Sequence, residues 1–149
     1  MITVKRWKIS SLRPPPKQHF RNRRPSYFTA IVFGCLIATY LDLLLVGKGL
    51  YEFPKRPFSD VFPIDVFFTL VALPLFTLLF LYMGKHMSRK GRCLFYLGLG
   101  LAAAVFEMLA ESAGLLRHTE SWHHWYSTIG YFLFMYLVWM VSQGVRVNK

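Results

Sequence analysis

Four apolar runs, each about as long as a membrane-crossing helix, constrain the fold of this 149-residue chain most strongly. About 20 helical residues cover the roughly 30 Å hydrocarbon core of a bilayer. The composition agrees, because 54% of the residues are hydrophobic and only 17% are charged, whereas soluble domains carry about 25% charged residues. The sequence therefore predicts an all-α polytopic membrane protein whose four transmembrane helices form one compact bundle over residues 27–143. The predicted spans cover about 27–46, 61–83, 93–116 and 125–143.

The first 26 residues form a basic, proline-rich segment. They hold eight of the 18 Lys and Arg residues and no acid. Their four prolines prevent a continuous helix, so we expect a disordered cytoplasmic tail. A basic tail next to an apolar run favours contact with anionic lipid headgroups. No nucleic-acid partner is expected, because that would require base-stacking groups arranged along a groove. The cations of the tail are Lys5, Arg6, Lys8, Arg13, Lys17, Arg21, Arg23 and Arg24.

The distribution of Lys and Arg predicts the orientation. If the tail is cytoplasmic, the 84–92 loop and the 144–149 terminus share its side, which then carries fourteen cations against four on the other. The positive-inside rule places both termini in the cytoplasm. Tyr51, Trp122 and Trp125 fit an aromatic belt at the outer interface. We expect a multi-pass plasma-membrane protein whose partners are the lipid bilayer and either a membrane protein or a second copy of itself.

Acidic residues lie in three of the predicted spans, all toward the outer end of the bundle. A charged group in hydrocarbon costs several kcal/mol, so each should face protein or water and have a partner. Glu107 and Glu111 are four residues apart and share a helical face. Arg56, in an outer loop, is expected to form a bidentate pair with a carboxylate. The predicted polar cluster comprises Asp42, Arg56, Asp65, Glu107, Glu111, His118 and Tyr126.

Two patterns bear on helix geometry. Pro74 lies in the middle of the second run, where it should kink or locally open the helix. The segment 98–104, GLGLAAA, places small residues at spacings that favour close helix packing.

The polar cluster allows three interpretations. It is a salt-bridged network that fixes helix register, a small-molecule or proton-handling pocket, or a site for a divalent metal such as zinc. No HExxH, GxSxG, P-loop or GxGxxG motif is present, so the usual motifs for metallopeptidase, acyl-transfer, nucleotide and hydride chemistry are absent. The histidines between Trp122 and Trp125 are also typical interfacial anchors. The candidate metal ligands are Glu107, Glu111, His118, His123 and His124.

Three stretches resemble an uncharacterised family of short four-span membrane proteins from spore-forming Gram-positive bacteria. They are ATYLDLLLVGKGLYEFPKRPF at 38–58, FTLVALPLFTLLFLY at 68–82 and EMLAESAGLLRHTESWHHWYSTIGYFLF at 107–134. Together they cover most of the chain from Ala38 onward. The resemblance implies a polytopic bacterial membrane protein but no activity. It also implies a similar polar set that includes Asp42, Arg56, Glu107, Glu111 and His118.

The predicted function is that of a non-enzymatic membrane module, either an accessory subunit or a small-molecule binder. The alternative is a metal-assisted membrane enzyme or a small transporter that uses Glu107, Glu111 and His118. An enzyme needs a water-reachable cavity on which acids and histidines converge. A purely structural network would instead be closed by pairs between arginine and carboxylates.

Overall fold

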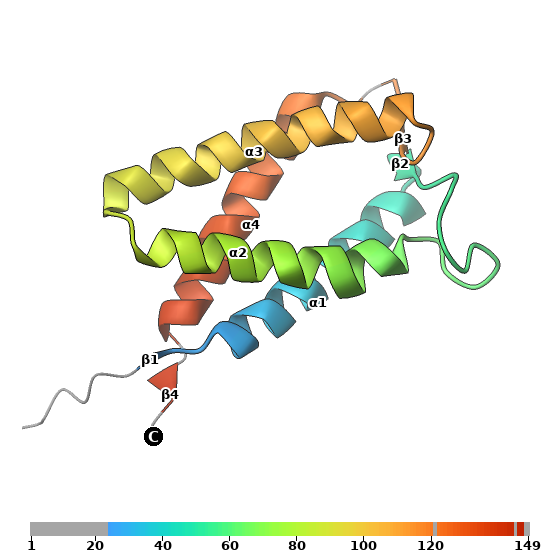
Figure 1. Ribbon diagram of the computed structural model, residues 1–149. Helices are drawn as coiled ribbons and strands as arrows, with labels where there is room; N and C mark the ends of the chain where they lie inside the picture. Colours follow the sequence, from blue (N-terminus) through green and yellow to red (C-terminus); the bar gives the residue numbers. More distant parts are fainter. Residues whose placement is uncertain (1–23, 121, 145, 148–149) are drawn as a thin grey trace, which may run out of the picture.

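The computed structural model describes residues 24–120, 122–144 and 146–147 (Figure 1). The fold is mostly helical, as predicted. Its helices are α1 (Tyr27–Gly47), the π-helical segment η1 (Phe68–Ala72), α2 (Leu73–Lys85), α3 (Arg89–Ser112) and α4 (His124–Gly144). Its strands are β1 (Arg24–Pro25), β2 (Tyr51–Glu52), β3 (Arg117–His118) and β4 (Arg146–Val147). The predicted tail lies outside the described residues up to position 23.

Three helices are long and apolar enough to cross a membrane: α1, the continuous η1–α2 helix and α3. They carry many large apolar side chains on their outer faces; Phe28 is 77% exposed and Leu94 is 70% exposed. Such faces suit lipid rather than water. Helix α4 has 21 residues but is not among the three. Its aromatic and hydroxyl residues, such as Tyr126 and Ser127, lower its hydropathy below that of a candidate membrane span.

Side-chain caps set where the helices begin. The second helix starts later than the apolar run, because an Asp65 Oδ1 atom accepts the Phe68 N–H at 3.0 Å. Helix α3 starts earlier, because the Ser88 hydroxyl oxygen accepts the Gly91 N–H at 3.2 Å. Beyond its end, Gly114 adopts a φ of +69°, a conformation that favours glycine. The polar caps, rather than the ends of the apolar runs, therefore determine where these helices begin.

The local opening expected at Pro74 is present as a π-helical segment. Pro74 stands in the first turn of α2, directly after η1. Proline lacks the N–H that an α-helix needs, and its ring clashes with the carbonyl four residues earlier. The wider π turn accommodates both effects. The helix thereby continues through the proline instead of ending there.

The two ends of the bundle differ in their connections. The α2–α3 turn and the β1–β4 pair lie toward one end, and the β2–β3 pair and the loop 53–65 lie toward the other (Figure 1). Strand β1 pairs antiparallel with β4, so the start of α1 and the end of α4 are neighbours. Helix α4 packs against both α3 and α1, and α1 packs against α2. The two ends are named the β1–β4 end and the β2–β3 end below.

The packed core lies toward the β1–β4 end. It is formed by side chains from the second half of α2, the first half of α3 and the second half of α4, together with one from α1. Phe80 and Tyr96, for example, contact each other edge to face with ring centroids 5.5 Å apart. The fully buried members are Ala30, Phe80, Leu81, Tyr96, Met135 and Val138. The β2–β3 end has no comparable buried cluster among the described residues, and it holds the candidate site.

The small residues of the 98–104 segment serve two purposes. Gly100 and Ala104 are buried, and a Cβ atom at Gly100 would lie only 2.8 Å from the Thr128 carbonyl oxygen of α4. The expected close packing is therefore confirmed at Gly100. Ala102 and Ala103 instead line a cavity. Their small side chains help to leave that space open.

Candidate functional site

A partly open cavity of about 450 Å³ lies at the β2–β3 end and is lined by residues of all four helices and of strands β2 and β3. Most of its wall is apolar, with phenylalanine, leucine and alanine side chains from η1, α2 and α3. Three of its polar residues are acids, and no Lys or Arg lines it among the described residues. An apolar pocket with a few convergent polar groups is the usual form of a small-molecule site. The polar lining residues are Asp42, Tyr51, Asp65, Glu107, His118 and Tyr131.

Tyr51 and Asp42 form one side of the polar wall. The Tyr51 hydroxyl donates a hydrogen bond to Asp42 Oδ1. Burial, reinforced by the neighbouring Asp42 carboxylate, raises the pKa of Tyr51 above its ordinary value. The phenol therefore stays protonated and remains a donor at neutral pH. The end of α1 is joined in this way to strand β2.

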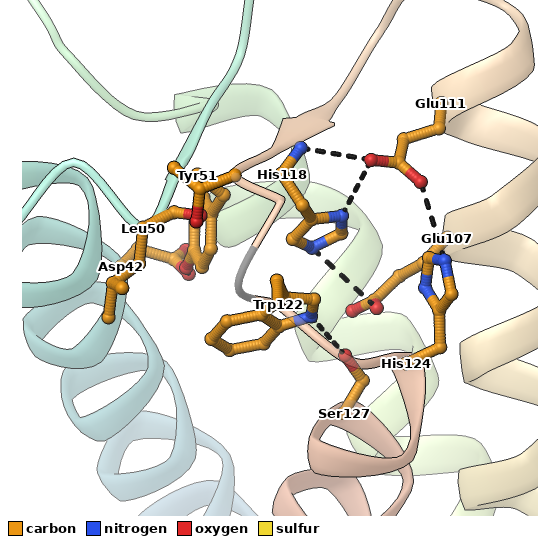
Figure 2. A network of polar contacts seen from close by, with 10 residues as sticks. Asp42, Leu50, Tyr51, Glu107, Glu111, His118, Trp122, His124 and Ser127 are labelled. Carbon is orange, nitrogen blue, oxygen red and sulfur yellow. Dashed lines mark hydrogen bonds and ion pairs between the residues drawn. The ribbon is translucent and has the colours of Figure 1, made fainter.

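His118 occupies the centre of the site (Figure 2). Its side chain is 5% exposed. Glu111 Oε1 lies 2.9 Å from both the backbone nitrogen and Nδ1 of His118. On the other side of the ring, Nε2 lies 3.9 Å from Glu107 Oε2. The imidazole therefore stands between two carboxylates that project from one face of α3.

Aromatic rings hold the His118 imidazole in place. Trp122 stacks on it with centroids 5.1 Å apart and an interplanar angle of 9°. Tyr51 contacts it edge to face at 5.7 Å. The Trp122 indole N–H in turn donates to the Ser127 hydroxyl oxygen at 3.3 Å. These contacts restrict rotation of the ring before any ligand binds.

His124 extends the arrangement toward the surface. Its Nε2 atom lies 3.5 Å from Glu111 Oε2, and its side chain is 33% exposed. Carboxylate and imidazole groups therefore alternate from the cavity outward. We name Glu107, His118, Glu111 and His124 the Glu–His cluster. One donor atom from each of Glu111, His118 and His124 lies within 4.8 Å of the other two.

The pairing of β2 with β3 brings distant parts of the chain together. Tyr51 is opposite His118, and Glu52 is opposite Arg117. The Thr119 N–H donates to the Leu50 carbonyl oxygen at 3.1 Å and extends the link beyond the strands. Strand β2 directly follows α1 and β3 directly follows α3. This short pairing is therefore what sets Asp42 and Tyr51 beside the carboxylates of α3.

The structure places Arg56 differently from the expectation. Its guanidinium group does not contact a carboxylate within the described residues. It donates to the carbonyl oxygens of Phe53 at 2.6 Å, Phe62 at 2.7 Å and Ser59 at 3.2 Å. The loop 53–65 makes backbone hydrogen bonds of its own only around Phe58, and the Arg56 guanidinium supplies donors to three of its other carbonyl groups. Arg56 thus fixes the loop and does not neutralise the acids.

The other predicted residues divide between the site and its surroundings. Asp42, Glu107, Glu111 and His118 come together as expected. Asp65 lines the cavity but also caps the second helix. Tyr126 is 41% exposed and packs on aromatic neighbours outside the cavity. His123 is exposed and contacts Tyr126, so it is not part of the Glu–His cluster.

The aromatic residues have a larger part in the site than the sequence predicts. The sequence places Tyr51 and Trp122 in an interfacial belt, and in the structure both contact His118. Two-residue strands carry no detectable periodicity, so the pairing that brings Tyr51 to His118 has no signature in the sequence. From the start of α4 the predicted cluster included Tyr126, whereas Tyr131, about one turn further along, is the tyrosine of this helix that lines the cavity.

Comparison with protein-family models, curated proteins and solved structures finds no match to this chain. The function must therefore be argued from the residues of the site and from their geometry.

Proposed function

We propose that the protein is a four-span plasma-membrane module that binds a small amphipathic molecule in the cavity at its β2–β3 end. The observation that carries the proposal is the cavity itself, which has an apolar wall, three acids and no cation among the described residues. The role is that of a non-enzymatic binder or accessory subunit. It agrees with the resemblance to four-span proteins of spore-forming bacteria. The basic tail would contact anionic headgroups on the cytoplasmic side.

The fourth span is supported by the arrangement of α4. This helix has 21 residues, the same number as α1, and packs against α1 and α3. The β1–β4 pair sets its end beside the start of α1. If α1 crosses the bilayer, a helix of equal length that returns to the same end crosses it as well. Ile129, Leu133 and Met140 on its exposed face suit contact with lipid.

Both termini and the α2–α3 turn are expected in the cytoplasm, and the loop 53–65 outside. The test starts from a variant in which Cys35 and Cys93 are replaced by serine. An impermeant maleimide should label Ser59→Cys on intact cells, but Met87→Cys only after the cells are permeabilised. The reverse pattern would contradict the orientation. Labelling of a cysteine added at the C-terminus of the chain on intact cells would contradict the even number of spans.

The charge of the cavity selects the chemistry of the bound molecule. Asp42, Asp65 and Glu107 supply acceptor groups, and Lys and Arg are absent from the described lining. A ligand carboxylate would meet like charge, whereas a protonated amine or another strong donor would be paired. We therefore assign the cavity to an amphipathic amine with a short apolar body. The proposal makes this amine a bound molecule and not a substrate.

Filling the cavity should abolish binding. Ala103 on α3 lines the cavity, whereas Leu101 on the same helix is 55% exposed on the outer face. With a photoreactive alkylamine in vesicles, Ala103→Trp should reduce crosslinking about 10- to 100-fold, because the indole occupies the ligand's space and overpacking typically costs about 1–3 kcal/mol. Leu101→Trp adds the same side chain on the lipid side and should crosslink like the parent protein. Equal crosslinking of the two variants would exclude the cavity as the binding site.

A further inference from the structure

We propose that the Glu–His cluster binds a divalent transition-metal ion such as zinc, with Glu111, His118 and His124 as its ligands. The donor set would be His118 Nδ1, His124 Nε2 and a Glu111 oxygen. Glu111 and His124 do not line the cavity, so this site lies beside it, behind the wall formed by His118 and Glu107. The inference stands independently of the amphipathic molecule proposed above.

The spacing of the donor atoms suits a tetrahedral ion. Ligand atoms bound to zinc at about 2.0–2.1 Å lie roughly 3.3 Å from one another. The observed separations are 2.9 Å between His118 Nδ1 and Glu111 Oε1, and 3.5 Å between Glu111 Oε2 and His124 Nε2. These two contacts use different oxygens of the Glu111 carboxylate, and one donor atom from each of the three residues lies within 4.8 Å of the other two. His124 stands at the start of α4, and its side chain is 33% exposed.

The surroundings of His118 are those of a metal ligand. A histidine that binds a metal through one nitrogen usually donates its other ring N–H to a carboxylate, which orients the ring. Glu107 Oε2 lies 3.9 Å from His118 Nε2 and is a buried oxygen without a hydrogen-bond partner. Trp122 and Tyr51 pack on the ring from two further directions. Glu107 therefore acts as a positioning residue for His118.

The donor types select the metal. Two imidazoles and one carboxylate favour zinc and neighbouring first-row ions, whereas magnesium and calcium prefer oxygen ligands alone. Three protein ligands also leave the fourth position of zinc open. The adjacent His123 is exposed and points to Tyr126, so it supplies a matched control for His124.

The test is zinc binding by the full chain, purified in detergent with an affinity tag free of histidine and then treated with a chelator. Calorimetric titration should give about one zinc ion per chain and no binding of magnesium. His124→Gln should weaken zinc binding by at least about 100-fold, the upper end of what loss of an outer-shell partner costs. His123→Gln should leave it unchanged, and Glu107→Gln should weaken it about 10- to 100-fold.

The variant His124→Gln separates a metal site from a purely structural network. Its amide retains an N–H donor for Glu111 but is a poor zinc ligand, so the melting temperature of the metal-free protein should change little. Absence of zinc binding by the parent protein would overturn the proposal, as would equal losses in His123→Gln and His124→Gln. Folding of each variant is checked by circular dichroism of the metal-free protein, whose helical signal should persist in His124→Gln whatever happens to zinc.

Should His124→Gln fail to fold, a second measurement on the parent protein tests whether the ion binds beside His118. Cobalt(II) bound beside His118 should quench the fluorescence of the stacked Trp122. The Trp122→Phe variant should bind cobalt in the calorimeter but show much weaker quenching. Quenching that is equally strong in Trp122→Phe would place the ion elsewhere and contradict the assignment.

Discussion

Gly100→Ala is expected to destabilise the protein by about 2 kcal/mol, because α3 and α4 approach too closely at this position to accept a methyl group. The added Cβ would lie 2.8 Å from the Thr128 carbonyl oxygen and 3.6 Å from the Phe132 nitrogen. Both atoms belong to the backbone of α4, so the helix itself must move. The cavity is expected to change shape as well, since Ala102 and Ala103 on the same turn of α3 line it.

Gly98 provides the matched control on the same helix. A Cβ at Gly98 would meet nothing within 4 Å. Gly98→Ala should therefore leave stability unchanged or raise it by up to about 1 kcal/mol, because alanine loses less backbone entropy in a helix. Thermal unfolding in one detergent, followed by circular dichroism, measures both variants. Equal shifts of the melting temperature would show that α3 and α4 are not in close contact at Gly100.

Glu111→Ala is expected to cost about 2–4 kcal/mol in the metal-free protein, because Glu111 is the acceptor for several donors. Its Oε1 atom lies 2.9 Å from both the backbone nitrogen and Nδ1 of His118, and its Oε2 atom lies 3.5 Å from His124 Nε2. The His118 side chain is 5% exposed, so water replaces these contacts poorly. The loop that carries β3 should loosen with them.

Glu52→Ala tests whether any glutamate at this end would have the same effect. Glu52 pairs with Arg117 at 3.1 Å, but their side chains are 58% and 72% exposed. A surface pair of this kind contributes less than about 1 kcal/mol. The melting temperature should therefore fall far more for Glu111→Ala than for Glu52→Ala. Similar losses would mean that the Glu–His cluster is no more important to stability than an exposed ion pair.

The sequence was a good guide to the helices because their determinants are local. Runs of about 20 apolar residues and a mid-run proline are visible without any knowledge of tertiary contacts. They predicted the helical fold, and three of the helices are apolar enough to span a membrane. The bounds were less accurate, since the Asp65 and Ser88 caps fall outside or beside the apolar runs.

The site was only partly predictable, because its geometry depends on contacts between distant segments. The spacing of Glu107 and Glu111 on one helical face was sufficient to place them together. Charge complementarity suggested Arg56 as their partner, but the carbonyl groups of its own loop satisfy that guanidinium. The β2–β3 pair and the cavity beside it have no local signature. They arise from how the four helices pack.

The measurement that tests the proposed function most directly compares two photoreactive probes of equal chain length, an alkylamine and an alkyl carboxylate, in vesicles that contain the parent protein. The acidic lining predicts crosslinking by the amine, mapped to residues of the cavity wall on α3, and much weaker crosslinking by the carboxylate. Stronger crosslinking by the carboxylate, or equal labelling of the cavity wall and the lipid-facing surface, would contradict the account.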